Sequence, residues 1–151
     1  MIKLKWSEQS LTQMMVNLQQ LKLNSKQGAK RALREVAVNI MAQSRAEIPV
    51  DTGTARNSSY ITNPVDWGKR ITIIMGYGGP NDKRNPDSGK MASEYVLELH
   101  ETPGTPLGGG AYHPYGKWKF LEDPVRAHAQ AFIQTLGKEL RIAYAPGVRV
   151  R

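Results

Sequence analysis

The chain has 151 residues, of which 40% are hydrophobic, and a formal net charge of +8. A chain of this length forms one ordinary domain and buries roughly 70% of its unfolded surface. No apolar run approaches the ~20 residues of a membrane span, and the first residues do not have the pattern of a signal peptide. There is no cysteine, which excludes disulfides and thiolate metal sites. We therefore expect a globular domain without membrane contact.

The positive charge is concentrated toward the two ends of the sequence. Residues 1–47 carry 8 basic and 3 acidic groups, a net charge of +5, and residues 102–151 carry 7 and 3, a net charge of +4. Residues 48–101 carry 6 basic and 7 acidic groups, a net charge of −1. This asymmetry favours an anionic neighbour, either nucleic acid or an acidic protein surface, although charge can also serve solubility alone.

The first third of the chain predicts a short strand followed by two helices. Residues 2–6 alternate between apolar side chains and lysine, as in an edge strand with one buried face. Apolar residues then follow a helical period over about 10–23, where two methionines are expected to fill gaps in the core. Asn24 or Ser25 is expected to cap a second, longer helix over roughly 26–47.

The second predicted helix is amphipathic. At about 100° per residue, one narrow apolar stripe contains Ala29, Leu33, Val36 and Ile40. One flank of that stripe carries four cations and no acid, namely Lys30, Arg31, Arg34 and Arg45. These cations are candidate contacts to DNA or to an acidic partner, and the alternative is an ordinary solvated helix face.

A corner with the sequence Pro-Val-Asp-Thr-Gly follows this helix at residues 49–53. Pro49 cannot continue a helix, and Gly53 supplies a positive φ where the turn requires one. Residues 54–63 then have β-like composition, and residues 63–68 have the composition of a turn.

The middle of the chain predicts two further strands and two long loops. Residues 70–77 alternate as a strand, and Ile74 on its second face implies that this face is also partly covered. Residues 93–101 alternate in the same way. The loops, at about 76–92 and 102–118, are rich in glycine and proline, and loops of this length often contact a partner.

The last predicted element is a helix that begins at Asp123-Pro124, with Asp as the cap and Pro at the first helical position. Its apolar stripe contains Val125, Ala129, Phe132, Leu136, Leu140 and Ala143. A short basic tail occupies residues 146–151. The expected order is β-α-α-β-β-β-α. It predicts an α+β fold in which a small antiparallel or mixed sheet has long helices packed on one face, within a single domain over residues 1–151.

No motif for catalysis is present in the sequence. The side chains Glu98, His100, Glu101 and His113 could form a metal site on paper, but Glu101 would point away from the first two on a strand. The chain lacks a Gly-x-Ser-x-Gly elbow and a phosphate-binding loop with its Lys-Ser/Thr. We expect no enzymatic activity, no cofactor and no metal. A small basic nucleic-acid-binding module remains an alternative function, although no known nucleic-acid motif is present.

Three segments in a fixed order resemble a known protein family. Residues 46–58 contain the corner followed by Arg56 and a serine, residues 95–101 read Tyr-Val-Leu-Glu-Leu-His-Glu, and residues 119–124 read Lys-Phe-Leu-Glu-Asp-Pro. This order resembles the tail-completion, or neck, proteins of long-tailed bacteriophages, often called minor tail or head–tail joining proteins. The resemblance covers about residues 26–143.

The resemblance implies a structural role in the virion, after assembly in the host cytoplasm. Family members are similar in fold to tail-terminator proteins. They form a ring, commonly sixfold, between the head-side connector or portal adaptor and the tail tube or tail terminator, around the DNA channel. The implied contacts with packaged DNA are non-specific. The candidate contacts to neighbouring subunits or partners are Asp51, Thr52, Gly53, Arg56, Tyr112, His113, Tyr115 and Trp118.

Overall fold

The computed structural model describes residues 8–102 and 116–144. In chain order, the elements are α1 (Glu8–Glu47), α2 (Thr54–Asn57), β1 (Tyr60–Ile61), β2 (Val65–Asp66), β3 (Ile71–Thr72), β4 (Met75–Gly76), the 3-10 turn η1 (Gly79–Asn81), α3 (Ala92–Glu101) and α4 (Glu122–Tyr144). The mixed α+β class is confirmed. The observed order differs from the expected one, and the strands form two separate two-stranded sheets. The predicted strand at residues 2–6, most of the loop at 102–118 and the tail at 146–151 lie outside the described residues.

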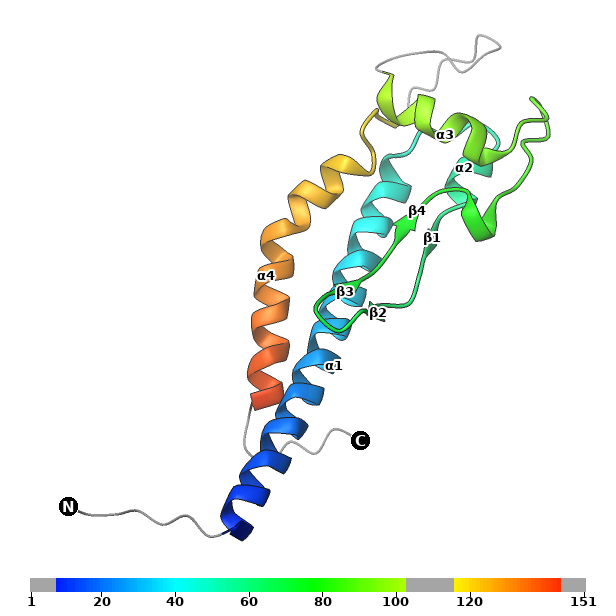
Figure 1. Ribbon diagram of the computed structural model, residues 1–151. Helices are drawn as coiled ribbons and strands as arrows, with labels where there is room; N and C mark the ends of the chain where they lie inside the picture. The colour runs from blue at the N-terminus through cyan, green and yellow to red at the C-terminus, as the bar shows by residue number, and fades with distance from the viewer. Residues whose placement is uncertain (1–7, 103–115, 145–151) are drawn as a thin grey trace.

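The long helix α1 organises the molecule (Figure 1). It lies between α4, which packs along one side, and the short strands, which contact it elsewhere. Gln43 is hydrogen-bonded to His128 over 3.1 Å, and Arg31 to Glu139 over 2.8 Å, so α4 runs antiparallel to α1. The short helices α2 and α3 gather at the C-terminal end of α1 (Figure 1).

The two predicted N-terminal helices are one continuous helix, so the predicted break at Asn24 and Ser25 is wrong. Neither side chain caps a new helix. The Ser25 hydroxyl donates to the carbonyl oxygen of Leu21 over 2.8 Å, and the Asn24 side chain accepts from Gln20 over 2.9 Å. Both polar groups are satisfied by the preceding turn, which lets the helix continue through them.

Burial changes sharply along α1. Residues 32, 36, 37, 40, 41 and 44 are buried, whereas every residue from 11 to 20 is exposed. Met14 is 45% exposed and Met15 is 64% exposed, so the prediction that these methionines fill the core is wrong. No described residue packs over them because α4 ends before it reaches this part of α1 (Figure 1).

The strands belong to one hairpin that is interrupted by a bulge. Tyr60 pairs with Gly76, and Val65 pairs with Thr72. The residue numbers of each pair add up to 136 in the first sheet and to 137 in the second, so the register shifts by one residue between the two sheets. One extra residue therefore lies in the first arm at Asn63-Pro64, where proline has no N–H to donate to the ladder. The single predicted strand at 70–77 is consequently split into β3 and β4. The predicted β-like start at 54 is also wrong, because residues 54–57 form α2.

Residues 92–101 form the helix α3, so the strand predicted at 93–101 is wrong. The buried side chains are Ala92, Tyr95 and Leu99, which recur every three to four residues, while Leu97 is 70% exposed. The Glu94 carboxylate accepts from the backbone N–H of Met91 over 2.7 Å. This cap fixes the first turn of the helix and selects the helical period over the alternating one.

The main hydrophobic cluster lies at the C-terminal end of α1, where three distant segments meet. It contains Ile48, Ala55, Ala92, Tyr95, Leu99 and Phe120. The Phe120 ring is fully buried and makes edge contacts with the rings of Tyr77 and His100, at centroid distances of 5.5 and 5.1 Å. The helix predicted from Asp123 is confirmed as α4, which begins one residue earlier at Glu122. Within its predicted stripe Ala143 is buried, but Val125 is 40% exposed.

Candidate functional site

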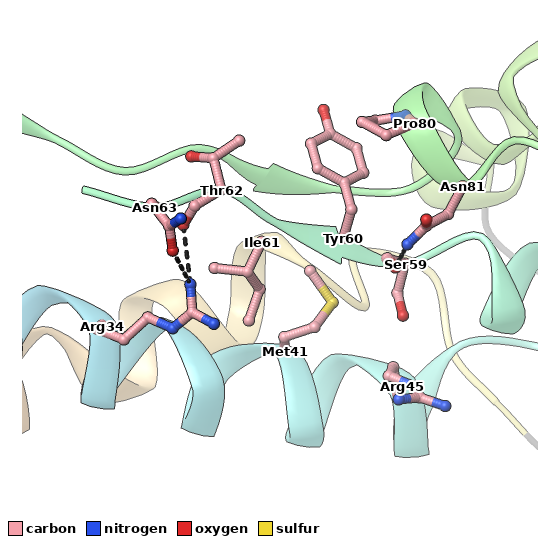
Figure 2. A pocket seen from close by; sticks show the side chains of 10 residues that line it. All are labelled: Arg34, Met41, Arg45, Ser59, Tyr60, Ile61, Thr62, Asn63, Pro80 and Asn81. Atoms are coloured by element: carbon pink, nitrogen blue, oxygen red, sulfur yellow. Dashed lines mark hydrogen bonds between the residues drawn. The ribbon is translucent and has the colours of Figure 1, made fainter. Parts of the chain in front are cut away.

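A groove of about 540 Å³ lies between α1 and the first arm of the hairpin (Figure 2). It is lined by Arg34, Met41, Arg45, Ser59, Tyr60, Ile61, Thr62, Asn63, Pro80 and Asn81. Two guanidinium groups from α1 face hydroxyl and amide groups from the hairpin and η1. Such a lining can bind an anion, either a phosphate or a carboxylate, because both groups accept hydrogen bonds from guanidinium.

Arg34 is fixed at one end of the groove by the hairpin. Its guanidinium donates to the carbonyl oxygen of Thr62 over 3.2 Å and to the side-chain oxygen of Asn63 over 3.1 Å (Figure 2). The bulge at Asn63-Pro64 places both acceptors beside α1. These two contacts leave further N–H donors of the planar group free to bind an anion.

Arg45 lies at the other end of the groove, three turns further along α1. It is exposed, and it has no hydrogen bond or ion pair to any other residue in the described part of the chain. Nearby, the buried Ser44 hydroxyl shares a hydrogen bond of 2.7 Å with the Tyr77 phenol. Burial raises the pKa of Tyr77, while the Ser44 contact and the charges of Arg45 and Arg56 act in the opposite direction. Arg45 is thus a cation that is free to meet an anionic ligand.

The other two predicted cations of the α1 flank point elsewhere. Arg31 forms an ion pair of 2.8 Å with Glu139 and so helps to hold α4 against α1. Lys30 lies near Asp66, whose carboxylate also forms an ion pair of 2.8 Å with Lys26. The Lys26 ammonium and the N–H of Gly68 hold the pKa of Asp66 below its usual value. The structure therefore brings Arg34 and Arg45 together in one groove, without Lys30 and Arg31.

The Pro-Val-Asp-Thr-Gly corner joins α1 to α2. Gly53 has a φ of 79°, as its predicted role in the turn requires, and it precedes the first residue of α2. The hydroxyls of Thr52 and Thr54 share a hydrogen bond of 2.8 Å, and Asp51 is exposed. The cavity beside the corner measures about 10 Å³, enough for no more than one water molecule. The corner therefore leaves no room for a small-molecule ligand in this cavity.

Arg56, which follows the corner, has a buried Nε with no hydrogen-bond partner among the described residues. Trp118 is 43% exposed, and the Lys119 ammonium lies 5.2 Å from the centroid of its ring. The remaining predicted contacts, Tyr112, His113 and Tyr115, lie outside the described residues.

An ion-pair network at the start of α4 was not predicted. The Lys117 ammonium lies 2.9 Å from the Asp123 carboxylate and 3.1 Å from that of Glu47. Lys119 and Arg126 both pair with Glu122. Lys117 thereby ties the beginning of α4 to the end of α1. Hydrogen bonds from Lys117 to Asp123 and from Lys119 to Glu122 are the main cause of the lowered pKa values of these two carboxyl groups. Only the spacing of Lys119 to Glu122 and of Glu122 to Arg126 was visible in the sequence.

Within residues 8–102 and 116–144, no group of three or more His, Cys, Asp or Glu side chains could hold a metal ion. His100 instead serves the fold, because its ring accepts from the backbone N–H of Glu122 over 3.3 Å and contacts Glu101 over 2.7 Å. None of the described helices is apolar enough over a sufficient length to cross a membrane.

Comparisons of the chain with protein-family models, curated proteins and solved structures found no match.

Proposed function

We propose that the chain is a structural subunit of the neck of a long-tailed bacteriophage. In this role it forms a ring, commonly sixfold, that joins the head-side connector to the tail tube or tail terminator around the DNA channel. It is assembled in the host cytoplasm, retained in the virion, and makes or breaks no covalent bond. Its contacts are with copies of itself, with the proteins above and below, and non-specifically with packaged DNA.

The observation that carries the proposal is the meeting of the three resembling segments. Ile48 and Ala55 from the corner segment, Tyr95 and Leu99 from the second segment, and Phe120 from the third belong to one hydrophobic cluster. Residues that pack in one core constrain each other's size and shape, so an ordered set of motifs that meet in one core can mark a fold. This packing supports the interpretation that the three segments together form the signature of one fold. The role in the neck then follows from the resemblance.

The charge of the molecule is compatible with a site beside DNA. The chain has a net charge of +8, and the groove presents Arg34 and Arg45 with no acidic side chain in its lining. A channel wall binds DNA through phosphates alone, which needs cations at its surface and no base-reading motif. An acidic surface on a neighbouring connector protein would satisfy the same two guanidinium groups.

Assembly is the first test of the proposal. Light scattering and negative-stain images should show rings, formed by the purified chain alone or together with its head-side and tail-side neighbours. Neighbouring genes should encode portal, capsid or tail-tube proteins, and finished particles should contain the chain. A chain that forms no ring under any of these conditions and is absent from particles would exclude the neck function.

The groove can be tested separately with Arg45→Glu, which reverses one unpaired charge. The matched control is Lys138→Glu, because Lys138 is also exposed and also lacks an ion pair among the described residues, but lies on α4. We expect fewer infectious particles from Arg45→Glu and normal numbers from Lys138→Glu. Equal titres for both variants would remove the groove from the proposed function.

The same groove favours one alternative, a freestanding nucleic-acid-binding module. That reading predicts a monomer whose affinity for short duplex DNA falls steeply with salt, because each phosphate contact releases counterions. Binding curves at two salt concentrations, combined with sedimentation of the same sample, separate the two functions. A monomer with strong salt-dependent binding and no assembly would favour the module.

A further inference from the structure

The N-terminal part of α1 carries an apolar face that no described residue covers. We call residues 8–23 of this helix the arm. The large exposed side chains on this face are Leu11, Met14, Met15 and Leu18, which are between 45% and 64% exposed, whereas the exposed Val16 and Leu23 lie on the opposite side of the helix. The sequence from Gln9 to Leu21 contains no charged residue, although the chain as a whole is strongly basic. Contiguous exposed apolar surface of this kind marks an interaction site.

The arm continues an interface that is already formed within the chain. Gly28 packs so closely on α4 that an added Cβ would lie 3.2 Å from the carbonyl oxygen of Glu139. At 100° per residue, Leu11, Met14, Leu18 and Leu21 lie on the same side of α1 as Gly28 and Ala32. Together with the polar Ser25, which lies between Leu21 and Gly28, these six residues follow a seven-residue repeat with alternating steps of three and four, which is the spacing of a helix-pairing seam. The arm therefore presents the unfilled continuation of the α1–α4 seam.

The length of the uncovered seam follows from the register of the two helices. Arg31 and Gly28 both contact Glu139, and α4 runs antiparallel to α1. Tyr144, five residues further along α4, therefore lies opposite about residues 23–26 of α1. About 16 residues of α1, roughly 24 Å at 1.5 Å per residue, project beyond α4.

We propose that the arm packs antiparallel against the arm of a second copy of this chain. In that pairing Leu11 faces Leu21 of the second copy, and Met14 faces its Leu18, so the paired numbers sum to 32. Helix α1 of the second copy then begins opposite residue 24, which is where α4 ends. Each arm lies on the uncovered seam of the other subunit's α1, in the space beyond the end of that subunit's α4. The length of each arm therefore equals the length of the seam that it covers.

Electrostatics favour the same arrangement. The second arm runs in the direction of α4, and its N-terminus meets the C-terminus of α4. Opposite ends of two helix dipoles are thereby adjacent, which is favourable. The paired seams are uncharged, so two strongly basic chains approach where their mutual repulsion is smallest. The contact is two-fold and self-complementary, which makes it distinct from the head-to-tail contacts of a ring and independent of the proposed neck function.

Sedimentation of the full chain over about 1–100 µM tests the pairing. We expect a monomer–dimer equilibrium, and Leu18→Glu should raise its Kd about 100-fold or more, since a charge enters the centre of the apolar seam. The matched control is Leu97→Glu, because Leu97 is equally apolar and 70% exposed but lies on α3. It should leave the Kd unchanged. Unchanged circular dichroism of the monomers shows that both variants fold.

Cross-linking tests the orientation, since the chain has no cysteine of its own. A mixture of Met14→Cys and Leu18→Cys chains should form a mixed disulfide on air oxidation, and neither variant alone should cross-link efficiently. A wild-type chain that stays monomeric over the whole range, or a dimer that survives Leu18→Glu, would overturn the proposal. Efficient cross-linking of Met14→Cys with itself would indicate parallel arms and would also overturn it.

Discussion

The two ends of α1 have similar sequence patterns but opposite surroundings. Around Met41 and up to Ile48, which directly follows the helix, α1 is covered by α4, by the hairpin and by the cluster around Phe120. Around Met14 and Leu18, nothing in the described structure covers it. Apolar periodicity predicts a helix at both ends, but it does not predict whether the apolar face is covered by the same chain.

This difference has an energetic consequence. An isolated helix of about 16 residues is only marginally stable in water, and most helix stability in proteins comes from packing. In a monomer the arm has little packing against the described residues and is held mainly by its continuity with the buried half. Mutations in the two halves should therefore differ greatly in their effect on the free energy of unfolding.

The largest contrast is expected between Phe120→Ala and Leu18→Ala. Phe120 is fully buried against Tyr77 and His100, so its truncation should cost about 3–5 kcal/mol of stability. Leu18 is 59% exposed, so its truncation should cost about 0.5 kcal/mol or less in dilute monomer. Urea unfolding of both variants at low protein concentration measures the difference. Similar losses would show that the arm is packed in the monomer.

A second contrast compares two glycines. Gly116 has a φ of 120°, and an added Cβ would lie 2.5 Å from the Cα of Pro49, so Gly116→Ala should cost about 2 kcal/mol or more. Gly137 on α4 has no atom within 4 Å of an added Cβ, and Gly137→Ala should stabilise the helix by about 0.5–1 kcal/mol. Thermal unfolding should move the two midpoints in opposite directions. A tolerated Gly116→Ala would mean that the corner shifts without cost.

The sequence was sufficient to predict α4 and the buried half of α1, because both are long and strongly periodic. It was insufficient for α3. Tyr95 and Leu99 fit both an alternating and a helical period, and Leu97 made alternation the simpler choice. The helix is selected by polar contacts from outside the periodic pattern, where Glu94 caps Met91 and Asp82 accepts from the Ser93 N–H over 3.1 Å. When a segment fits both a strand period and a helical period, only its tertiary contacts determine which of the two forms.

The sequence predicted residues on only one wall of the groove, the wall that belongs to α1. Arg34 and Arg45 were visible as members of a charged helix flank, since helix geometry fixes which residues share a face. Tyr60 and Asn81 on the opposite wall gave no signal, because their position depends on the bulge at residues 63–64 and on how the hairpin lies against α1. The sequence also grouped Arg31 with the groove cations, although Glu139, more than one hundred residues later, draws it toward α4.

A smaller effect is expected from Tyr77→Phe, which tests the join between α1 and the hairpin. The variant leaves the buried Ser44 hydroxyl without its 2.7 Å partner, so it should cost about 1–2 kcal/mol at about pH 8. Burial raises the pKa of Tyr77, so its phenol stays neutral in the folded state while the unfolded state ionises near pH 10. The contribution of Tyr77 is therefore present below about pH 10 and is lost as the pH rises toward its folded-state pKa.

Urea unfolding between about pH 8 and pH 11 measures this dependence. Wild-type stability should fall faster with rising pH than that of Tyr77→Phe, so the gap between the two should narrow. Tyr144→Phe, on the exposed end of α4, is the control and should follow the wild type. A constant gap over the whole range would contradict the burial of Tyr77.

The smallest effect is expected from Asp66→Asn at the border between the covered and uncovered halves of α1. Asp66 ties the hairpin to Lys26, just beyond the arm, in a partly exposed ion pair that salt screens. Lys26 holds the pKa of Asp66 below its usual value, so the stabilisation exists above about pH 4 and is lost as the pH falls through the folded-state pKa. The variant and the wild type should therefore differ slightly at neutral pH and low salt and coincide in acid or at high salt. A difference that persists under both conditions would mean that the hairpin tip is held by packing instead of by charge, and that the covered half of α1 extends further toward the arm.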